Sequence, residues 1–454
     1  MKAAAALLPA LLAGCASYQP MTLPDGDRLA REVRELKVDT GAMPDAAMRG
    51  HRFDPSDGLD MTEVAMLAVV GNPELKLARA QAGVTRAQAF SAGLLPDPQL
   101  SLTREQALGS PAGATVAFGA GLAIDVGALL ARSSASGAAD AESRKSDLDL
   151  LWQEWQTVAK ARLLFVRLDA LAASRALLQA ARAQARQRLD EATRAVDRGL
   201  ATTDTAAPLL AAFEEASRQA GDVEHQANQA RHDLNELLGV APDVELVLVG
   251  ASDVAPMTAS QVRDALATST TRRPDLLALQ AGFEAQDDRY RGALRAQFPA
   301  ITIGPTRARD TSDVNTAGFA LGITLPLFNR NRGNIAIESA TRGKLRAEYQ
   351  QRLDATAGDA HRLLAEDAIA QRQLAEIDAS LPALTQAVDD AERAYASHAI
   401  DALALTATES AWTARRLERI AVQQARQEQA IALQALLGTS LLLPHAGEPG
   451  TRTP

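Results

Sequence analysis

The chain has 454 residues, of which 47% are hydrophobic but only 4% aromatic, and it carries a net charge of −9. An apolar content dominated by Ala and Leu suits close-packed helices better than sheets, which favour β-branched and aromatic residues. The negative charge argues against a nucleic-acid binder, because phosphate contacts need a basic face. The single cysteine excludes an intramolecular disulfide framework. Length alone allows about three domains.

The only cysteine, Cys15, closes an N-terminal segment with the features of a signal peptide. Lys2 supplies the positive charge, and residues 3–12 are apolar but too few to span a bilayer. The sequence Leu-Ala-Gly-Cys at 12–15 resembles a bacterial lipobox, which predicts cleavage before Cys15 and attachment of lipid, palmitate included, to this residue. Ala16 follows where an Asp often retains lipoproteins at the inner membrane, so an outer-membrane anchor is expected. The alternative is an ordinary secretory signal with a chance cysteine.

The chain contains an internal duplication. Four short segments recur in the same order at an offset of about 200 residues, far longer than a solenoid repeat. They are 72–75 with 273–276, 94–96 with 297–299, 121–124 with 322–325, and 237–239 with 436–438. Two similar substructures are therefore expected in each chain.

Each repeat is predicted to contain a helix, two strands, a long helix and a shorter helix, because apolar spacing changes between helical and alternating periods. Pro382 is expected to kink the second long helix. The predicted helices are 59–92, 138–198, 204–238, 334–397 and 401–437, and the strands lie near 99–103, 116–126, 301–303 and 319–327. The predicted segments are a signal peptide (1–14), an extended tether (15–58), a first repeat (59–239), a linker (240–271), a second repeat (272–438) and a disordered tail (439–454).

Two of the predicted strands alternate large apolar with small or polar residues. This pattern fits either a sheet with one face on a soluble core or a membrane strand with one face on lipid. Four strands cannot close a barrel, so the membrane interpretation requires several chains to pool their strands. The candidate lipid-facing residues are Val116, Phe118, Leu122, Ile124, Phe319, Leu321, Ile323 and Leu325.

The motifs and the duplication together resemble the TolC-like outer-membrane efflux family. The resemblance covers about residues 59–438 and depends on the motifs at 72–75, 93–96, 272–276 and 325–329 and on the two Leu-Leu-Gly ends. It implies a mainly α fold with a small β membrane part. Three chains would then form one twelve-stranded β-barrel and a long helical periplasmic tunnel. Residues 325–333 resemble the heavy-metal, CzcC-like members, which serve resistance–nodulation–division pumps.

The same resemblance places an adaptor-docking tip at the two helical hairpin turns. The matching residues are Arg198, Gly199 and Leu200 in the first repeat and His398, Ala399 and Ile400 in the second. His398 stands where the family usually has Gly, and its side chain could titrate near neutral pH and tune opening of the tip. Plain hairpin-turn chemistry is the alternative interpretation of both turns.

No catalytic, cofactor or metal constellation is evident. There is no P-loop, no G-x-S-x-G and no Glu-x-x-His, and His232 with Glu236 reads as a solvated helix face. We therefore expect a non-enzymatic, passive outer-membrane channel that extends into the periplasm. It would work with a periplasmic adaptor and an inner-membrane pump to export metal cations or small toxic compounds. The alternatives are the channel of a type I protein secretion system and a non-channel periplasmic coiled-coil lipoprotein.

Overall fold

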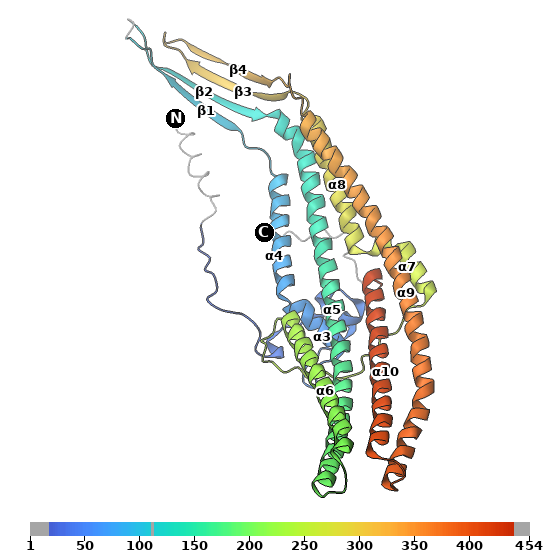
Figure 1. Ribbon diagram of the computed structural model, residues 1–454. Helices are drawn as coiled ribbons and strands as arrows, with labels where there is room; N and C mark the ends of the chain where they lie inside the picture. The colour runs from blue at the N-terminus through green and yellow to red at the C-terminus, as the bar shows by residue number, and fades with distance from the viewer. Residues whose placement is uncertain (1–17, 110–112, 440–454) are drawn as a thin grey trace.

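The structure is a computed structural model that describes residues 18–109 and 113–439. The predicted signal peptide (1–14), Cys15 and residues 440–454 of the predicted tail lie outside the described residues. The molecule is elongated, with a β-sheet at one end, long helices along its body and two helical hairpin turns at the other end (Figure 1). This arrangement confirms the predicted fold class, mainly α with a small β part.

The sheet joins both repeats. It contains β1 (Gln99–Glu105), β2 (Ala117–Asp125), β3 (Ala300–Arg309) and β4 (Asn315–Thr324), paired antiparallel in that order. The predicted strands 116–126 and 319–327 were therefore wrong at their ends. Val116 and Leu325 lie just outside β2 and β4. The second of these strands ends before Pro326, which has no N–H to donate to a ladder.

The first repeat departs from the prediction in two places. The predicted helix 59–92 is divided into α3 (Met61–Gly71) and α4 (Pro73–Gly93), because Asn72 caps the second helix and Pro73 occupies its first position. The long helix α5 (Val126–Asp197) follows β2 directly, well before the predicted start at residue 138. The Asp125 side chain accepts the Ala128 N–H at 3.0 Å and so caps this early start. The shorter helix α6 (Thr203–Leu238) agrees with the prediction.

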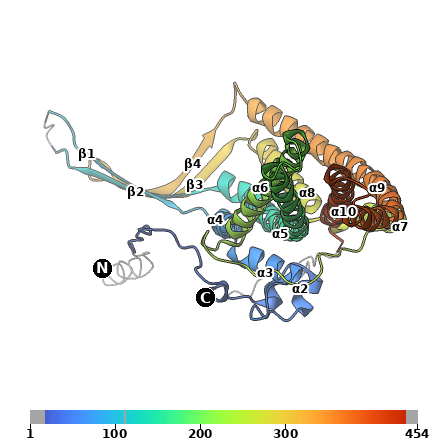
Figure 2. The same ribbon diagram turned by 60° about the horizontal axis from the view of Figure 1, so that its bottom comes forward.

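The second repeat contains α7 (Ala259–Arg272), α8 (Pro274–Arg295), α9 (Arg332–Ala396) and α10 (Ala402–Leu437). The helix α7 lies in the segment expected to be a linker, and a capping box between Thr258 and Gln261 starts it. Helix α9 continues through Pro382, and its ribbon curves around the other helices (Figure 2). The α7–α8 pair repeats the α3–α4 pair of the first repeat, with Pro274 in the place of Pro73.

Part of the segment expected to be an extended tether is folded. It contains η1 (Val33–Glu35), η2 (Thr40–Ala42) and α2 (Ala46–Gly50). Met43 and Met48 are buried in the main apolar cluster, which is built on α3, α5 and α6. Isolated parallel bridges join Ala30 to Val240 and Leu59 to Leu248. The prediction of an extended tether was therefore wrong for this part, because its buried methionines pack on the helical core.

Among the described residues, no helix carries an apolar run long enough to cross a bilayer.

Candidate functional site

The sheet has one large apolar face. Directly paired residues of antiparallel strands point to the same face, and the register pairs Leu100 with Leu122 and Ile303 with both Ile124 and Leu321. Apolar side chains on this face are exposed in the single chain, and Phe319 reaches 81% exposure. The face carries Leu100, Leu102, Phe118, Leu122, Ile124, Ile301, Ile303, Phe319, Leu321 and Ile323.

The opposite face is lined by small and polar residues. Hydroxyl residues there stand opposite glycines in both repeats: Ser101 and Thr103 opposite Gly121 and Gly119, and Thr302 and Thr306 opposite Gly322 and Gly318. A Cβ atom at Gly119 would lie 2.4 Å from Thr103 Oγ1, so the hydroxyl occupies the space that the glycine leaves. The alternation predicted for β2 and β4 therefore extends across all four strands.

Both outer strands keep one free side. Within the described residues, β1 pairs only with β2, and β4 pairs only with β3. A long strand with unpaired N–H and C=O groups is a template for pairing with another chain. The sheet is thus amphipathic and open at both edges.

Three arginines extend the apolar face at its end away from the helices. Arg104 pairs with Phe118, which pairs in turn with Arg309, and Arg307 lies on the same face of β3. Sequence reasoning missed this row, although Arg307 and Arg309 continue the alternation begun by Ile301 and Ile303. Its position at the strand ends suits side chains that reach the polar boundary of a membrane.

The two hairpin turns share one backbone design. Gly199 and His398 both adopt the left-handed conformation, with φ of 71° and 58°. In the first turn the Gly199 N–H donates to Val196 O at 2.9 Å and the Leu200 N–H to Ala195 O at 2.8 Å. This is a Schellman pattern, which satisfies the last carbonyls of α5.

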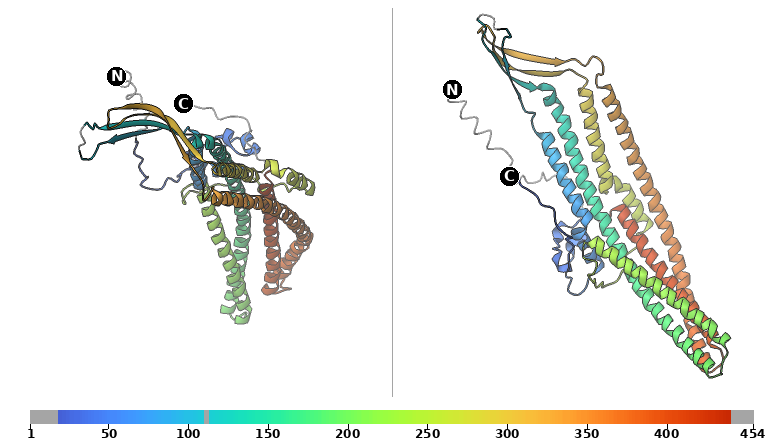
Figure 3. Two further views of the ribbon diagram at one scale, coloured as in Figure 1. Left: turned by 90° about the horizontal axis from the view of Figure 1, so that it is seen from above. Right: turned by 60° about the vertical axis from the view of Figure 1, so that its left-hand side comes forward.

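The second turn repeats these bonds with a histidine in place of the glycine. The His398 N–H donates to Tyr395 O at 2.9 Å, and the Ala399 N–H donates to Ala394 O at 2.8 Å. The α5–α6 and α9–α10 turns, which contain the predicted tip residues, lie at the same end of the molecule, opposite the sheet (Figure 3). Only Ile400 among them is partly buried, and the others are exposed.

A polar tie joins the two hairpins near these turns. Arg188 on α5 donates to Glu409 on α10, with Nε 3.3 Å from Oε2, and their side chains are only 13% and 12% exposed. The Arg188 guanidinium lies 5.3 Å from the centre of the Tyr395 ring on α9. The Tyr395 hydroxyl donates to Glu191 at 3.3 Å. Burial, followed by the neighbouring Glu191 carboxylate, raises the pKa of the Tyr395 hydroxyl.

Sequence reasoning missed this tie because its members come from three helices far apart in the chain. Arg188 and Glu409 lie among many similar Arg and Glu residues, and no local spacing distinguishes them. The tie connects the two repeats at the end of the molecule where the predicted docking turns lie. It therefore fixes how the hairpins sit against each other.

The fold and the second repeat both match known outer-membrane proteins. Residues 265–439 match the family model described as outer membrane efflux protein. CusC is 19% identical, with a TM-score of 0.71, and the match covers 91% of this chain and 98% of CusC. The CmeC outer membrane channel of Campylobacter jejuni is 15% identical, with a TM-score of 0.72 and coverages of 94% and 95%. The outer membrane protein VceC of Vibrio cholerae is 16% identical, with a TM-score of 0.69 and coverages of 83% and 96%.

No curated protein sequence matches the chain. The family model and the shared fold confirm the resemblance to TolC-like outer membrane efflux proteins. Residues 265–439 are thus similar to an outer membrane efflux protein domain, and the chain shares the fold of these channels.

Proposed function

We propose that this protein is the outer-membrane channel of a tripartite efflux system. The observation that carries the proposal is the amphipathic, open-edged four-stranded sheet at one end of a long helical body. A protomer alone leaves Phe319, Leu321 and Ile323 in water. Lipid against that face would remove the cost of exposing apolar side chains to water, and a neighbouring strand at each edge would pair the free N–H and C=O groups.

Three copies of the chain can pair all the free strand edges by forming one closed barrel. Pairing β4 of one chain with β1 of the next joins the four-stranded sheets into a closed ring of twelve strands, an even number within the range of such barrels. The large apolar face then turns to lipid, and the small face with Gly119 and Thr103 lines the interior. The helices continue from this ring into the periplasm, where they form a tunnel.

The hairpin turns are the proposed docking tip for a periplasmic adaptor. Arg198, Gly199 and Leu200 form one contact, and His398, Ala399 and Ile400 form the other. The exposure of the two matching Schellman turns at the end away from the sheet supports this role. An inner-membrane pump supplies the energy, and the motif at 325–333 favours the resistance–nodulation–division type with a heavy-metal cargo. Lipid on Cys15 adds an anchor in the same membrane.

The conduction proposal is tested with the full-length protein reconstituted into planar bilayers. Wild type should give stepwise ohmic currents and migrate as a trimer in detergent. A monomer without conductance would contradict the channel. The lipid anchor is tested separately, since Cys15→Ala should abolish labelling by radioactive fatty acid while trimer yield persists. Unchanged labelling would contradict the anchor and leave the channel proposal standing.

A further inference from the structure

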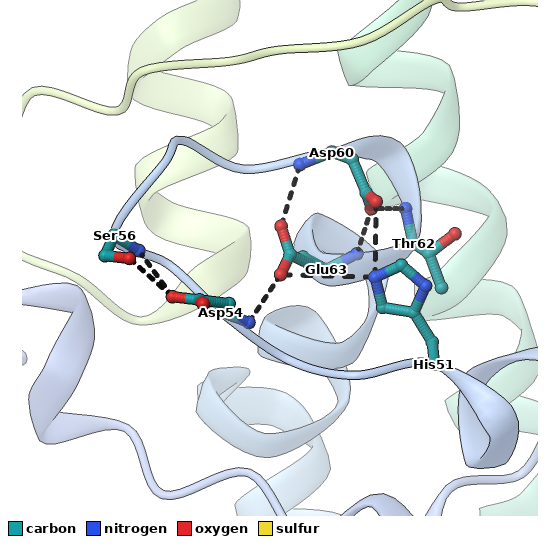
Figure 4. A network of polar contacts seen from close by, with 6 residues as sticks. All are labelled: His51, Asp54, Ser56, Asp60, Thr62 and Glu63. Atoms are coloured by element: carbon teal, nitrogen blue, oxygen red, sulfur yellow. Dashed lines mark hydrogen bonds and ion pairs between the residues drawn. The ribbon is translucent and has the colours of Figure 1, made fainter.

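We propose that His51, Asp60 and Glu63 form a binding site for a borderline divalent cation, with Zn²⁺ as the best fit. The three residues lie where the folded N-terminal segment meets α3 (Figure 4). The site is separate from the sheet and from the hairpin turns, and the inference does not depend on the proposed transport function.

The two carboxylates are held in place by the start of α3. Asp60 is the N-cap, and its Oδ1 accepts the Thr62 and Glu63 N–H groups at 2.7 and 2.8 Å. The Glu63 carboxylate accepts hydrogen bonds from the Asp60 N–H at 3.0 Å and from the Asp54 N–H at 2.7 Å. Glu63 is only 4% exposed, so its position is set by packing as well as by these bonds. Such support orients a ligand before the ion arrives.

The imidazole approaches both carboxylates. His51 Nε2 lies 3.2 Å from Asp60 Oδ2 and 4.0 Å from Glu63 Oε1, and the three ligand atoms all lie within 4.8 Å of one another. Zinc bonds of about 2.0–2.1 Å in a tetrahedron place ligand atoms roughly 3.3 Å apart. The first distance already fits, and a small movement of the part-exposed His51 ring brings its Nε2 atom closer to Glu63 Oε1.

The charges of the cluster favour a cation. Within the described chain, the only cationic group that forms an ion pair with Asp60 or Glu63 is His51. When the imidazole is neutral, as a metal ligand must be, two carboxylates face each other without a counter-charge. Arg162 lies nearby, but it donates to Met61 Sδ and Gln434 Oε1 instead. One imidazole and two carboxylates are a ligand set that zinc accepts, and solvent can supply the fourth position.

A bound ion would join two parts of the chain, one of which already contacts the inter-repeat segment. His51 follows α2, whereas Asp60 and Glu63 start α3. The adjacent Leu59 exchanges backbone bonds with the inter-repeat segment, its N–H with Val247 O at 2.8 Å and its carbonyl with the Val249 N–H at 3.0 Å. The ion would therefore hold the N-terminal segment against the core, and metal binding should raise the thermal midpoint of unfolding.

The test is calorimetric titration of the full-length protein in detergent with ZnCl₂ and, separately, MgCl₂. Wild type should bind one Zn²⁺ per chain and show no saturable Mg²⁺ binding, since Mg²⁺ prefers an all-oxygen shell. His51→Ala should weaken Zn²⁺ binding about tenfold or more. Zinc should also raise the thermal midpoint of wild type but not of this variant.

Two further variants keep the result unambiguous. His361→Ala removes an exposed histidine on α9 and should leave zinc affinity unchanged. Asp60→Asn keeps an N-cap acceptor but removes a charge, so it should weaken zinc binding while the metal-free thermal midpoint stays close to wild type. Equal zinc affinity in wild type and His51→Ala, or no saturable zinc binding by wild type, would overturn the proposal.

Discussion

Glu409→Gln should loosen the contact between the two helical hairpins. The Arg188 and Glu409 side chains are both about seven-eighths buried, so loss of the carboxylate charge leaves a largely desolvated guanidinium without its ion-pair partner. Breaking a buried ion pair costs about 3–5 kcal/mol, and the residual exposure of both groups favours the lower end. About 3 kcal/mol corresponds to roughly a hundredfold shift toward separated hairpins.

Spin labels can measure this shift directly. Labels at Ala183→Cys on α5 and Ala407→Cys on α10, both exposed, would report the distance between hairpins in a Cys15→Ser background. Glu409→Gln should broaden and lengthen the distance distribution and raise bilayer conductance, because the tie lies at the tip. The matched control is Glu418→Gln, whose partner Arg415 lies on the same helix. An unchanged distribution in Glu409→Gln, or an equal change in the control, would refute the reasoning.

If the large apolar face contacts lipid, Leu321→Arg should prevent membrane assembly, because an Arg there costs about 2–4 kcal/mol. The control Thr302→Arg, on the small face, should still assemble. A normal trimer yield from Leu321→Arg would count against the barrel. His398→Gly should stabilise the chain by about 1 kcal/mol because it relieves a left-handed conformation, and Gly199→His should cost about as much, as measured by urea unfolding. The pKa of Tyr395 is raised in the folded protein, so its protonated hydroxyl stabilises the fold fully when the pH is below the pKa of an ordinary tyrosine. This contribution is lost as the pH rises through the pKa that Tyr395 has in the folded state. Tyr395→Phe should therefore flatten the alkaline limb of the stability profile, and an identical limb would contradict this.

Local periodicity predicted the body of the fold well. Large and small residues alternate along β2 and β4 strictly enough to identify the strands, and α6 and α10 begin within a residue of their predicted starts. Two strand ends were wrong where a cap or a proline decides them, at Asp125 and Pro326. The strands predicted at 301–303 and 319–327 were also too short at one end, because β3 extends to Arg309 and β4 begins at Asn315. The helix α7 was missed because Pro242, Pro256 and the short apolar run at 244–249 that precede it resemble a linker, although the capping box at Thr258 was visible in the sequence.

The polar sites could not be predicted from local pattern. Arg188 and Glu409 are 221 residues apart in the sequence and meet only because the two hairpins pack together. His51 and Asp60 are close in sequence, but the segment between them was expected to be extended. Folding of the N-terminal segment on α3 is a tertiary event, driven by buried side chains such as Met43 and Met48.

The pairing of hydroxyl residues with glycines gives the small face of the sheet an unusual surface. Ser101, Thr103 and Thr302 each stand opposite a glycine, so that surface is formed by small hydroxyl groups and by backbone peptide groups. Peptide dipoles attract cations and anions with similar weakness and provide no shaped pocket. In the proposed trimer the small face would line the pore, and dissimilar solutes would pass along it without binding tightly. Discrimination among cargoes would then fall to the pump, and one conduit could serve pumps of different specificity.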